Sequence, residues 1–179
     1  MNDNNLFPTA APDFTDPLGL LRACHERILT HCSLLLQIAE RIQAEGVDDE
    51  VRQAAAKVHR YFSTAGRHHH ADEEEDLFPR LARQSLKLAD LVHQLRQEHE
   101  AIDTLWGSIE PLLARPANIS DTAAFADQAK ALAEAYQAHV AKENDDLLVF
   151  AQHIFGSDEL KKIGAAMAKR RGVKLPGQF

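Results

Sequence analysis

Residues 69–77 read HHADEEEDL and residues 139–147 read HVAKENDDL, so one skeleton occurs twice: His, three residues, Glu, two residues, Asp and Leu. We call this the HxxxE motif. A second motif alternates with it, because residues 21–28 read LRACHERI and residues 95–102 read LRQEHEAI. Both copies of this LRxxHE motif have the form Leu-Arg-x-x-His-Glu-x-Ile. The alternation indicates two similar halves, each with one copy of each motif.

Apolar residues recur along the chain at intervals of three and four positions, which predicts helices and almost no strand. The fold class is therefore all-α. Asp16 followed by Pro17 is typical of a helix start, because proline fits the first helical position. We expect four long helices: from residue 17 to about 44, from 49 to about 79 or shortly beyond, from about 86 to 113, and from about 121 to about 155. Ser120 should cap the fourth of them. A short last helix follows Gly156, with Ser157 as its cap, and stops at Gly172.

These helices predict an up-down-up-down four-helix bundle over residues 16–155. An extended N-terminal arm is expected over residues 1–15, and a short fifth helix with a tail over residues 156–179. A chain of 179 residues with 45% hydrophobic residues is long and apolar enough to build one core. We expect a single compact unit.

Composition and charge exclude several classes of protein. A net charge of −7 without a basic stripe argues against binding to nucleic acid. The sequence has no apolar run of about 18 residues, which is the length that a membrane-spanning helix requires. The start of the chain lacks the basic and apolar regions of a signal peptide. We therefore expect a cytoplasmic protein. Cys24 and Cys32 lie ~12 Å apart if they share one helix, too far for a disulfide, so both should be reduced thiols.

Four of the ten histidines fall in the middle of apolar stripes when the helices are drawn at about 100° per residue. A glutamate follows two of them one turn later. The residues expected to point into the core are His25, His69, Glu73, His99, His139 and Glu143. The residues expected at the surface are His31, His59, His68, His70, His93 and His153, and the acidic residues expected on a solvated face are Glu26, Glu74, Glu75 and Glu100.

This set of inward residues predicts a metal site. A lone histidine on an apolar face is more often an ordinary core residue, but here two carboxylates share a dry interior with four imidazoles and no inward Lys or Arg. A metal ion would supply the missing positive charge. The i, i+4 spacing puts imidazole and carboxylate on one helix face. Without a cation, we expect a raised pKa for at least one of Glu73 and Glu143.

The positions of the four histidines predict that they form one layer. In a bundle of antiparallel helices, residues at one level have the connecting turn midway between them in sequence. The midpoints between successive histidines are residues 47, 84 and 119, and each lies in an expected turn. The repeat then implies two equivalent half-sites. We expect two metal ions, with Glu73 and Glu143 as bridging carboxylates.

Several polar residues near the expected ligands are not expected to bind the metal themselves. Asp76 and Asp146 should lie near the inward face, where they would surround the ligands or line an entry path. Asp103 is a possible further ligand that we leave outside the set. Cys32 is expected to be a small core residue, because a redox role would require a lowered pKa.

The two LRxxHE motifs together with HHADEEEDLFPRL and HVAKENDDL resemble the hemerythrin-like, HHE cation-binding family over about residues 16–155. The resemblance implies a four-helix bundle with a non-haem di-iron centre. The ligands that it implies are His25, His69, His99 and His139 through nitrogen, and Glu73 and Glu143 as bridges. Oxygen-carrying hemerythrins have a fifth histidine on the third helix, whereas the corresponding positions here are Leu95 and Asp103. With an oxo or hydroxo bridge, each iron could keep one open position.

Three classes of function stay open at the level of sequence. The first is binding of a small ligand such as O2, NO or peroxide, in oxygen, nitrosative or oxidative stress sensing or in iron handling. The second is a redox enzyme: a ferroxidase, a peroxidase or an iron-centre repair protein. The third is a metal-stabilised module that binds a protein partner through the arm or the basic fifth helix. Imidazole and carboxylate also suit zinc and manganese, so the choice of iron depends on the resemblance.

Overall fold

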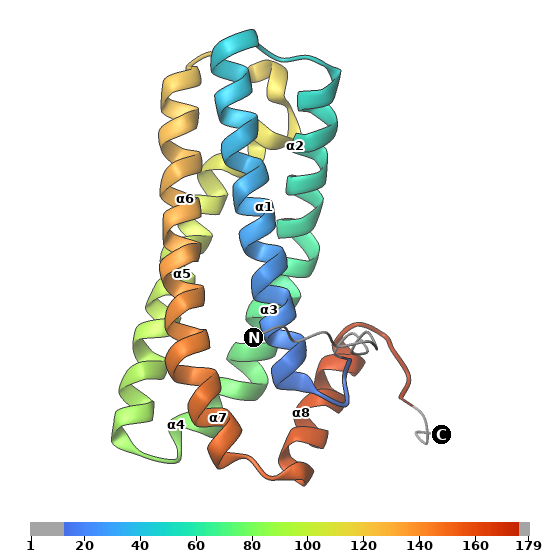
Figure 1. The fold of residues 1–179 in the computed structure, drawn as a ribbon, viewed down its shortest axis with the longest axis vertical. Coiled ribbons are helices and arrows are strands. Elements are labelled where there is room, and N and C mark those ends of the chain that lie inside the picture. Colours follow the sequence, from blue (N-terminus) through green and yellow to red (C-terminus); the bar gives the residue numbers. More distant parts are fainter. Residues whose placement is uncertain (1–12, 176–179) are drawn as a thin grey trace, which may run out of the picture.

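The computed structural model describes residues 13–175, which fold into helices and turns with no strand. The prediction of an all-α fold is confirmed. The expected extended arm lies outside the described residues, except for its last three positions. Figure 1 shows long helical segments lying lengthwise beside one another, with a shorter helix, α8, at one end. None of the helices in residues 13–175 combines the length and the apolar character needed to cross a membrane.

The helical segments follow the expected ranges closely. The first long helix is α1 (Pro17–Glu45) and the third is α5 (Leu86–Ala114). The second is continuous but mixed: α2 (Asp49–Tyr61), η1 (Phe62–Gly66), α3 (Arg67–Ala71), η2 (Asp72–Leu77) and α4 (Phe78–Ala82). After the short 3-10 turn η3 (Pro116–Asn118), the fourth contains α6 (Thr122–Lys142), η4 (Glu143–Leu147) and α7 (Leu148–Ile154), and α8 spans Ser157–Arg170.

The helix starts confirm one predicted cap and correct two. The side chain of Asp16 accepts a hydrogen bond from the backbone of Gly19 at 3.0 Å, as predicted. The cap of α6 is Asp121 rather than Ser120, and its carboxylate accepts from the Ala124 nitrogen at 2.9 Å. A carboxylate suits the positive end of a helix better than a hydroxyl does. Ser157 is the first residue of α8 and makes no capping bond.

Both copies of the HxxxE motif leave the α-helical path near the glutamate and return to it after the leucine. The segments η2 and η4 are π-helical, and each contains the glutamate of its motif. A π turn closes hydrogen bonds five residues apart and therefore shifts the phase of the residues that follow. Leu77 and Leu147 are fully buried, whereas Asp146 is exposed. The expectation that Asp146 lies near the inward face was wrong. Asp76, at the equivalent position of the other motif, is buried, and it pairs with Arg170 at the end of α8.

The core consists of two apolar clusters with a polar layer between them. One cluster includes Ile28 and Ile102, and the other includes Leu21 and Leu95. In each LRxxHE motif the leucine therefore packs in one cluster and the isoleucine in the other. The histidine of each motif lies between these two positions on the same helix face. The apolar positions of the motif thus fix the height of the histidine layer.

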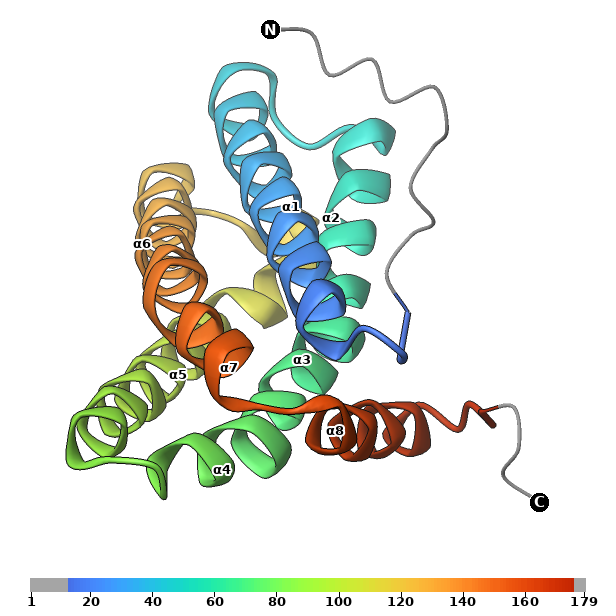
Figure 2. The ribbon, with the colours of Figure 1, turned by 60° about the horizontal axis from the view of Figure 1, so that its bottom comes forward.

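Helix α8 crosses the end of the bundle and packs on α1 and η2 (Figure 2). Arg170 and Arg171 both pair with Asp72, whose side chain is fully buried, and Arg170 also lies 2.8 Å from Asp76. Asp76 is therefore part of this ion-pair network. An added Cβ at Gly164 would collide with the backbone carbonyl of Phe14, so only glycine permits this close approach. The two arginines are engaged internally instead of forming a free basic surface.

Candidate metal centre

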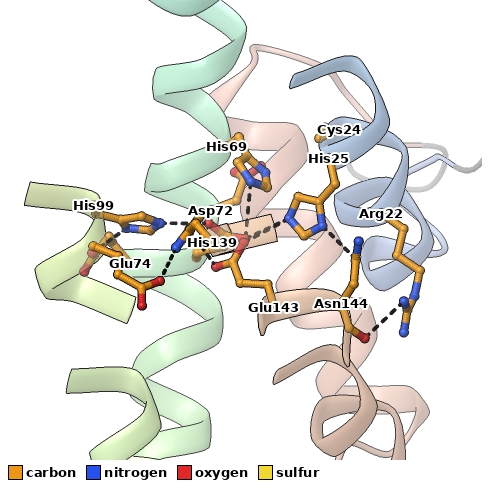
Figure 3. A network of polar contacts seen from close by, with 12 residues as sticks. Arg22, Cys24, His25, His69, Asp72, Glu74, His99, His139, Glu143 and Asn144 are labelled. Carbon is orange, nitrogen blue, oxygen red and sulfur yellow. Dashed lines mark hydrogen bonds and ion pairs between the residues drawn. The ribbon is translucent and has the colours of Figure 1, made fainter. Parts of the chain in front are cut away.

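The six residues predicted to point inward converge in one buried layer. Figure 3 labels all of them except Glu73. Each of them is at most 4% exposed. They form two overlapping groups in which one ligating atom of every member lies within 4.8 Å of the others. One group is His25, His69, Glu73 and Glu143, and the other is Glu73, His99, His139 and Glu143. The two glutamates are thus shared between a His25/His69 pair and a His99/His139 pair.

Each glutamate presents one carboxylate oxygen to each histidine pair. Glu73 places Oε1 3.4 Å from His69 Nε2 and Oε2 3.4 Å from His99 Nε2. Glu143 places Oε2 3.1 Å from His25 Nε2 and Oε1 3.2 Å from His139 Nε2. Two carboxylates that each span two imidazole pairs have the arrangement required of bridging ligands.

The inward atoms of this layer have no hydrogen-bond partner. They are the Nε2 atoms of His25, His69, His99 and His139 and both carboxylate oxygens of Glu73 and Glu143. Buried polar atoms are nearly always paired, because an unpaired one costs free energy. Imidazole nitrogen and carboxylate oxygen are ligands for divalent cations. The layer therefore fits a pair of metal ions by chemistry, burial and unsatisfied valence.

Three of the four histidines make a hydrogen bond through Nδ1, and their Nε2 atoms face the centre of the layer. His25 Nδ1 lies 2.8 Å from the amide oxygen of Asn144, and His99 Nδ1 lies 2.9 Å from Glu74. The third contact joins His139 Nδ1 to a carboxylate oxygen of Glu98 at 2.8 Å. Such contacts fix the tautomer and the ring orientation of a metal ligand.

These contacts join residues of the HxxxE motifs to residues of the LRxxHE motifs. The residue after the glutamate of each HxxxE motif, Glu74 or Asn144, contacts the histidine of an LRxxHE motif. The arginine of that LRxxHE motif contacts the same residue: Arg96 lies 3.0 Å from the Glu74 carboxylate, and Arg22 donates to the Asn144 carbonyl at 3.4 Å. The repeated Leu-Arg-x-x-His spacing thus places both the ligand and the cation that holds its partner.

Comparison with known proteins gives the family. The sequence model of the hemerythrin HHE cation binding domain matches residues 16–151. The chain belongs to this family. An uncharacterised protein of Haemophilus influenzae is 26% identical over 171 residues, which cover 94% of this chain and 98% of the relative.

Two residues of this HHE domain lie closer to the centre than the sequence predicted. Glu74 was expected on a solvated face, but it is half-buried and bonded to His99. His70 was expected at the surface, but its side chain is only 13% exposed, and its ring stacks on His99 with centroids 4.0 Å apart. A helical projection describes one helix alone, and both side chains are covered by the neighbouring α5. Asp103, in contrast, is 73% exposed and does not join the layer.

Glu98 and Asn144 were missed by the sequence analysis. A usable signal existed for Asn144, because it and Glu74 occupy the same position in the two HxxxE motifs and both carry an acceptor oxygen. Glu98 has no polar counterpart in the other LRxxHE motif. Cys32 is buried, as predicted, and burial raises the pKa of its thiol to about 12. Both cysteines are free thiols.

The electrostatics of the metal-free layer correct one expectation. Burial alone would raise the pKa values of Glu73 and Glu143, but the imidazoles around them hold both values below the ordinary one. Burial opposes a charge on His25 and His99, yet the negative charge of the nearby glutamate carboxylates favours the protonated imidazoles and raises their pKa values to about 10 and about 9. The expected rise in a glutamate pKa was wrong, because protons on the imidazoles replace the charge of the metal.

Variants at adjacent histidines test the assignment of the inward face. His69→Ala should remove at least one tightly bound metal ion, because this variant deletes a nitrogen in the layer. His68→Ala is the matched control, since His68 is the preceding residue of α3 and has no part in either group. Metal content after dialysis provides the measurement. Equal metal loss in both variants would contradict the assignment.

Proposed function

We propose that this chain holds two iron ions within an up-down-up-down four-helix bundle and that the di-iron centre binds a small ligand such as O2, NO or peroxide. The observation that carries the proposal is the buried layer of eight inward atoms without hydrogen-bond partners. Membership in a cation-binding family supports it. A cytoplasmic location and a separate protein partner belong to the same proposal.

In this proposal each histidine pair would hold one ion through two nitrogens, and Glu73 and Glu143 would each offer one carboxylate oxygen to each ion. Four protein donors per ion leave room for a bridging oxo or hydroxo group and for an external ligand. Iron would contribute Lewis acidity and one-electron redox chemistry. Zinc and manganese fit the same donors, and the family resemblance favours iron.

A cavity beside the layer supports access by a small ligand. Its volume is about 430 Å³, and its lining includes Phe62, His70, Trp106 and Tyr136. The ring of His70 separates this cavity from His99, on which it stacks. The ring nitrogens His70 Nε2 and Trp106 Nε1 are buried and have no hydrogen-bond partner.

Anaerobic loading with Fe²⁺, followed by O2, NO or peroxide, tests this function. We expect new absorption bands that appear on addition of the ligand and are reversed by its removal. Catalytic consumption of peroxide or NO would favour the redox enzyme instead. Spectra that do not respond to any of the three ligands would overturn the proposal of a ligand-binding centre. The Glu73→Gln/Glu143→Gln double variant is the control, because it should not form the centre.

A further inference from the structure

The His99/His139 pair is supported by charged groups. The Nδ1 atom of His99 lies 2.9 Å from a carboxylate oxygen of Glu74, and that of His139 lies 2.8 Å from a carboxylate oxygen of Glu98. Each carboxylate also pairs with a cation on a neighbouring helix: Glu74 with Arg96 and Glu98 with Lys142. A hydrogen bond to an ionised acceptor is shorter and stronger than one between neutral groups. Both rings of this pair are therefore firmly oriented.

The His25/His69 pair lacks this support. His25 contacts the neutral amide oxygen of Asn144 at 2.8 Å. The His69 side chain is only 1% exposed, and its buried Nδ1 atom has no hydrogen-bond partner. The two pairs thus share the same two glutamates and differ in the groups that contact Nδ1 of the imidazoles. Figure 3 shows Asn144 beside His25 and Glu74 beside His99.

The repeat locates the origin of this difference. The residue immediately before the histidine of the LRxxHE motif is Glu98 on α5 and Cys24 on α1. Glu98 reaches the HxxxE histidine of the adjacent helix, His139. Cys24 stands at the equivalent position for His69, but its thiol is shorter than a glutamate side chain and is a weak acceptor. One replacement between the two halves therefore leaves one ligand without a partner.

We propose that the two metal positions are inequivalent, with the His99/His139 pair holding its ion more tightly, and that the residue at position 24 or 98 sets the difference. Loss of such a partner typically weakens metal binding by roughly 10- to 100-fold. Glu98 is thus a positioning residue for His139, and Cys24 leaves the His25/His69 position the more labile one. This inference rests on the two-metal site proposed above.

Titration with Co²⁺ under anaerobic conditions can compare the two positions one at a time. His25→Ala removes a ligand from one pair, and His99→Ala removes a ligand from the other. We expect the His25→Ala protein to bind its remaining ion roughly 10- to 100-fold more tightly than the His99→Ala protein does. Absorbance of bound Co²⁺ and calorimetry give the two affinities, and circular dichroism checks that each variant is helical.

Exchange of the residues at positions 24 and 98 tests the cause. In the His25→Ala background, Glu98→Cys should lower the affinity toward that of the His99→Ala protein, and Glu98→Gln, which keeps the size, should lower it less. In the His99→Ala background, Cys24→Glu should raise the affinity, whereas the control Cys24→Ser should not.

The outcomes separate this inference from the proposed function. Equal affinities in the His25→Ala and His99→Ala proteins would overturn the inequivalence. No effect of either Glu98 variant would overturn the cause that we assign to it. Both results would leave a two-metal site intact. Binding of fewer than two Co²⁺ ions by the unaltered chain would overturn the two-metal site itself, and the inference with it.

Discussion

Replacement of Arg170 and Arg171 together by alanine should lower the free energy of unfolding by about 3 kcal/mol, because it removes the partners of a buried charge. Both arginines pair with Asp72, which is fully buried at the start of η2. An ionised carboxylate without a partner is costly in such a place. Urea denaturation followed by circular dichroism measures the change.

The matched control is the double variant Lys161→Ala/Lys162→Ala. It also removes two positive charges, both from α8, but both lysines are largely exposed and pair only within that helix. Its effect should stay below about 1 kcal/mol, as for most exposed ion pairs. Addition of Asp72→Asn to the arginine variant should recover part of the lost stability. An equally large loss of unfolding free energy in the lysine variant, or no recovery with Asp72→Asn, would contradict a stabilising role of the Asp72 ion pairs.

Removal of the metal should have the second large effect. A ligand that binds only the folded state stabilises it by about 4 kcal/mol at a free concentration 1,000 times its dissociation constant. Without metal, the pKa values of His25 and His99 rise to about 10 and about 9. The folded metal-free protein therefore retains these protons more strongly than the unfolded chain, and the stability that they contribute is lost as pH rises through that range.

The metal-bound protein should show the opposite dependence. Bound imidazoles cannot be protonated, so their pKa values in the folded state lie below the ordinary value of about 6.5. Stability should then fall as pH decreases below that value and protons compete for the ligands. Thermal melts between pH 5 and 9 should show a metal-free midpoint that declines above pH 7 and a metal-bound midpoint that declines below it. Parallel curves, with no shift on adding metal, would mean that the layer does not bind a cation.

The sequence predicted the helices and the inward residues because both depend on local periodicity. His25, for example, was placed correctly by the apolar residues of its own helix. The supporting contacts could not be predicted in this way, because they depend on which helix packs alongside. Glu74 looked solvated in projection and meets His99 on α5. The pairing of Arg171 with Asp72 joins positions 99 residues apart and left no local signal.

The surroundings of the residues after each glutamate were the other limit. Asp76 and Asp146 occupy the same position in the two HxxxE motifs, but Asp76 is buried and Asp146 is exposed. Asp76 pairs with Arg170, which is 94 residues away in the sequence, so its burial left no local signal. A π turn occurs at both copies of the motif and contains the glutamate that we propose as a metal ligand, and such turns often occur at functional sites.

The most direct test of the central claim is anomalous diffraction at the iron absorption edge from crystals of the iron-loaded protein. The account predicts two anomalous peaks in the histidine layer. One should lie beside the Nε2 atoms of His25 and His69, the other beside those of His99 and His139, with Glu73 and Glu143 between them. A single peak, or peaks outside this layer, would contradict it.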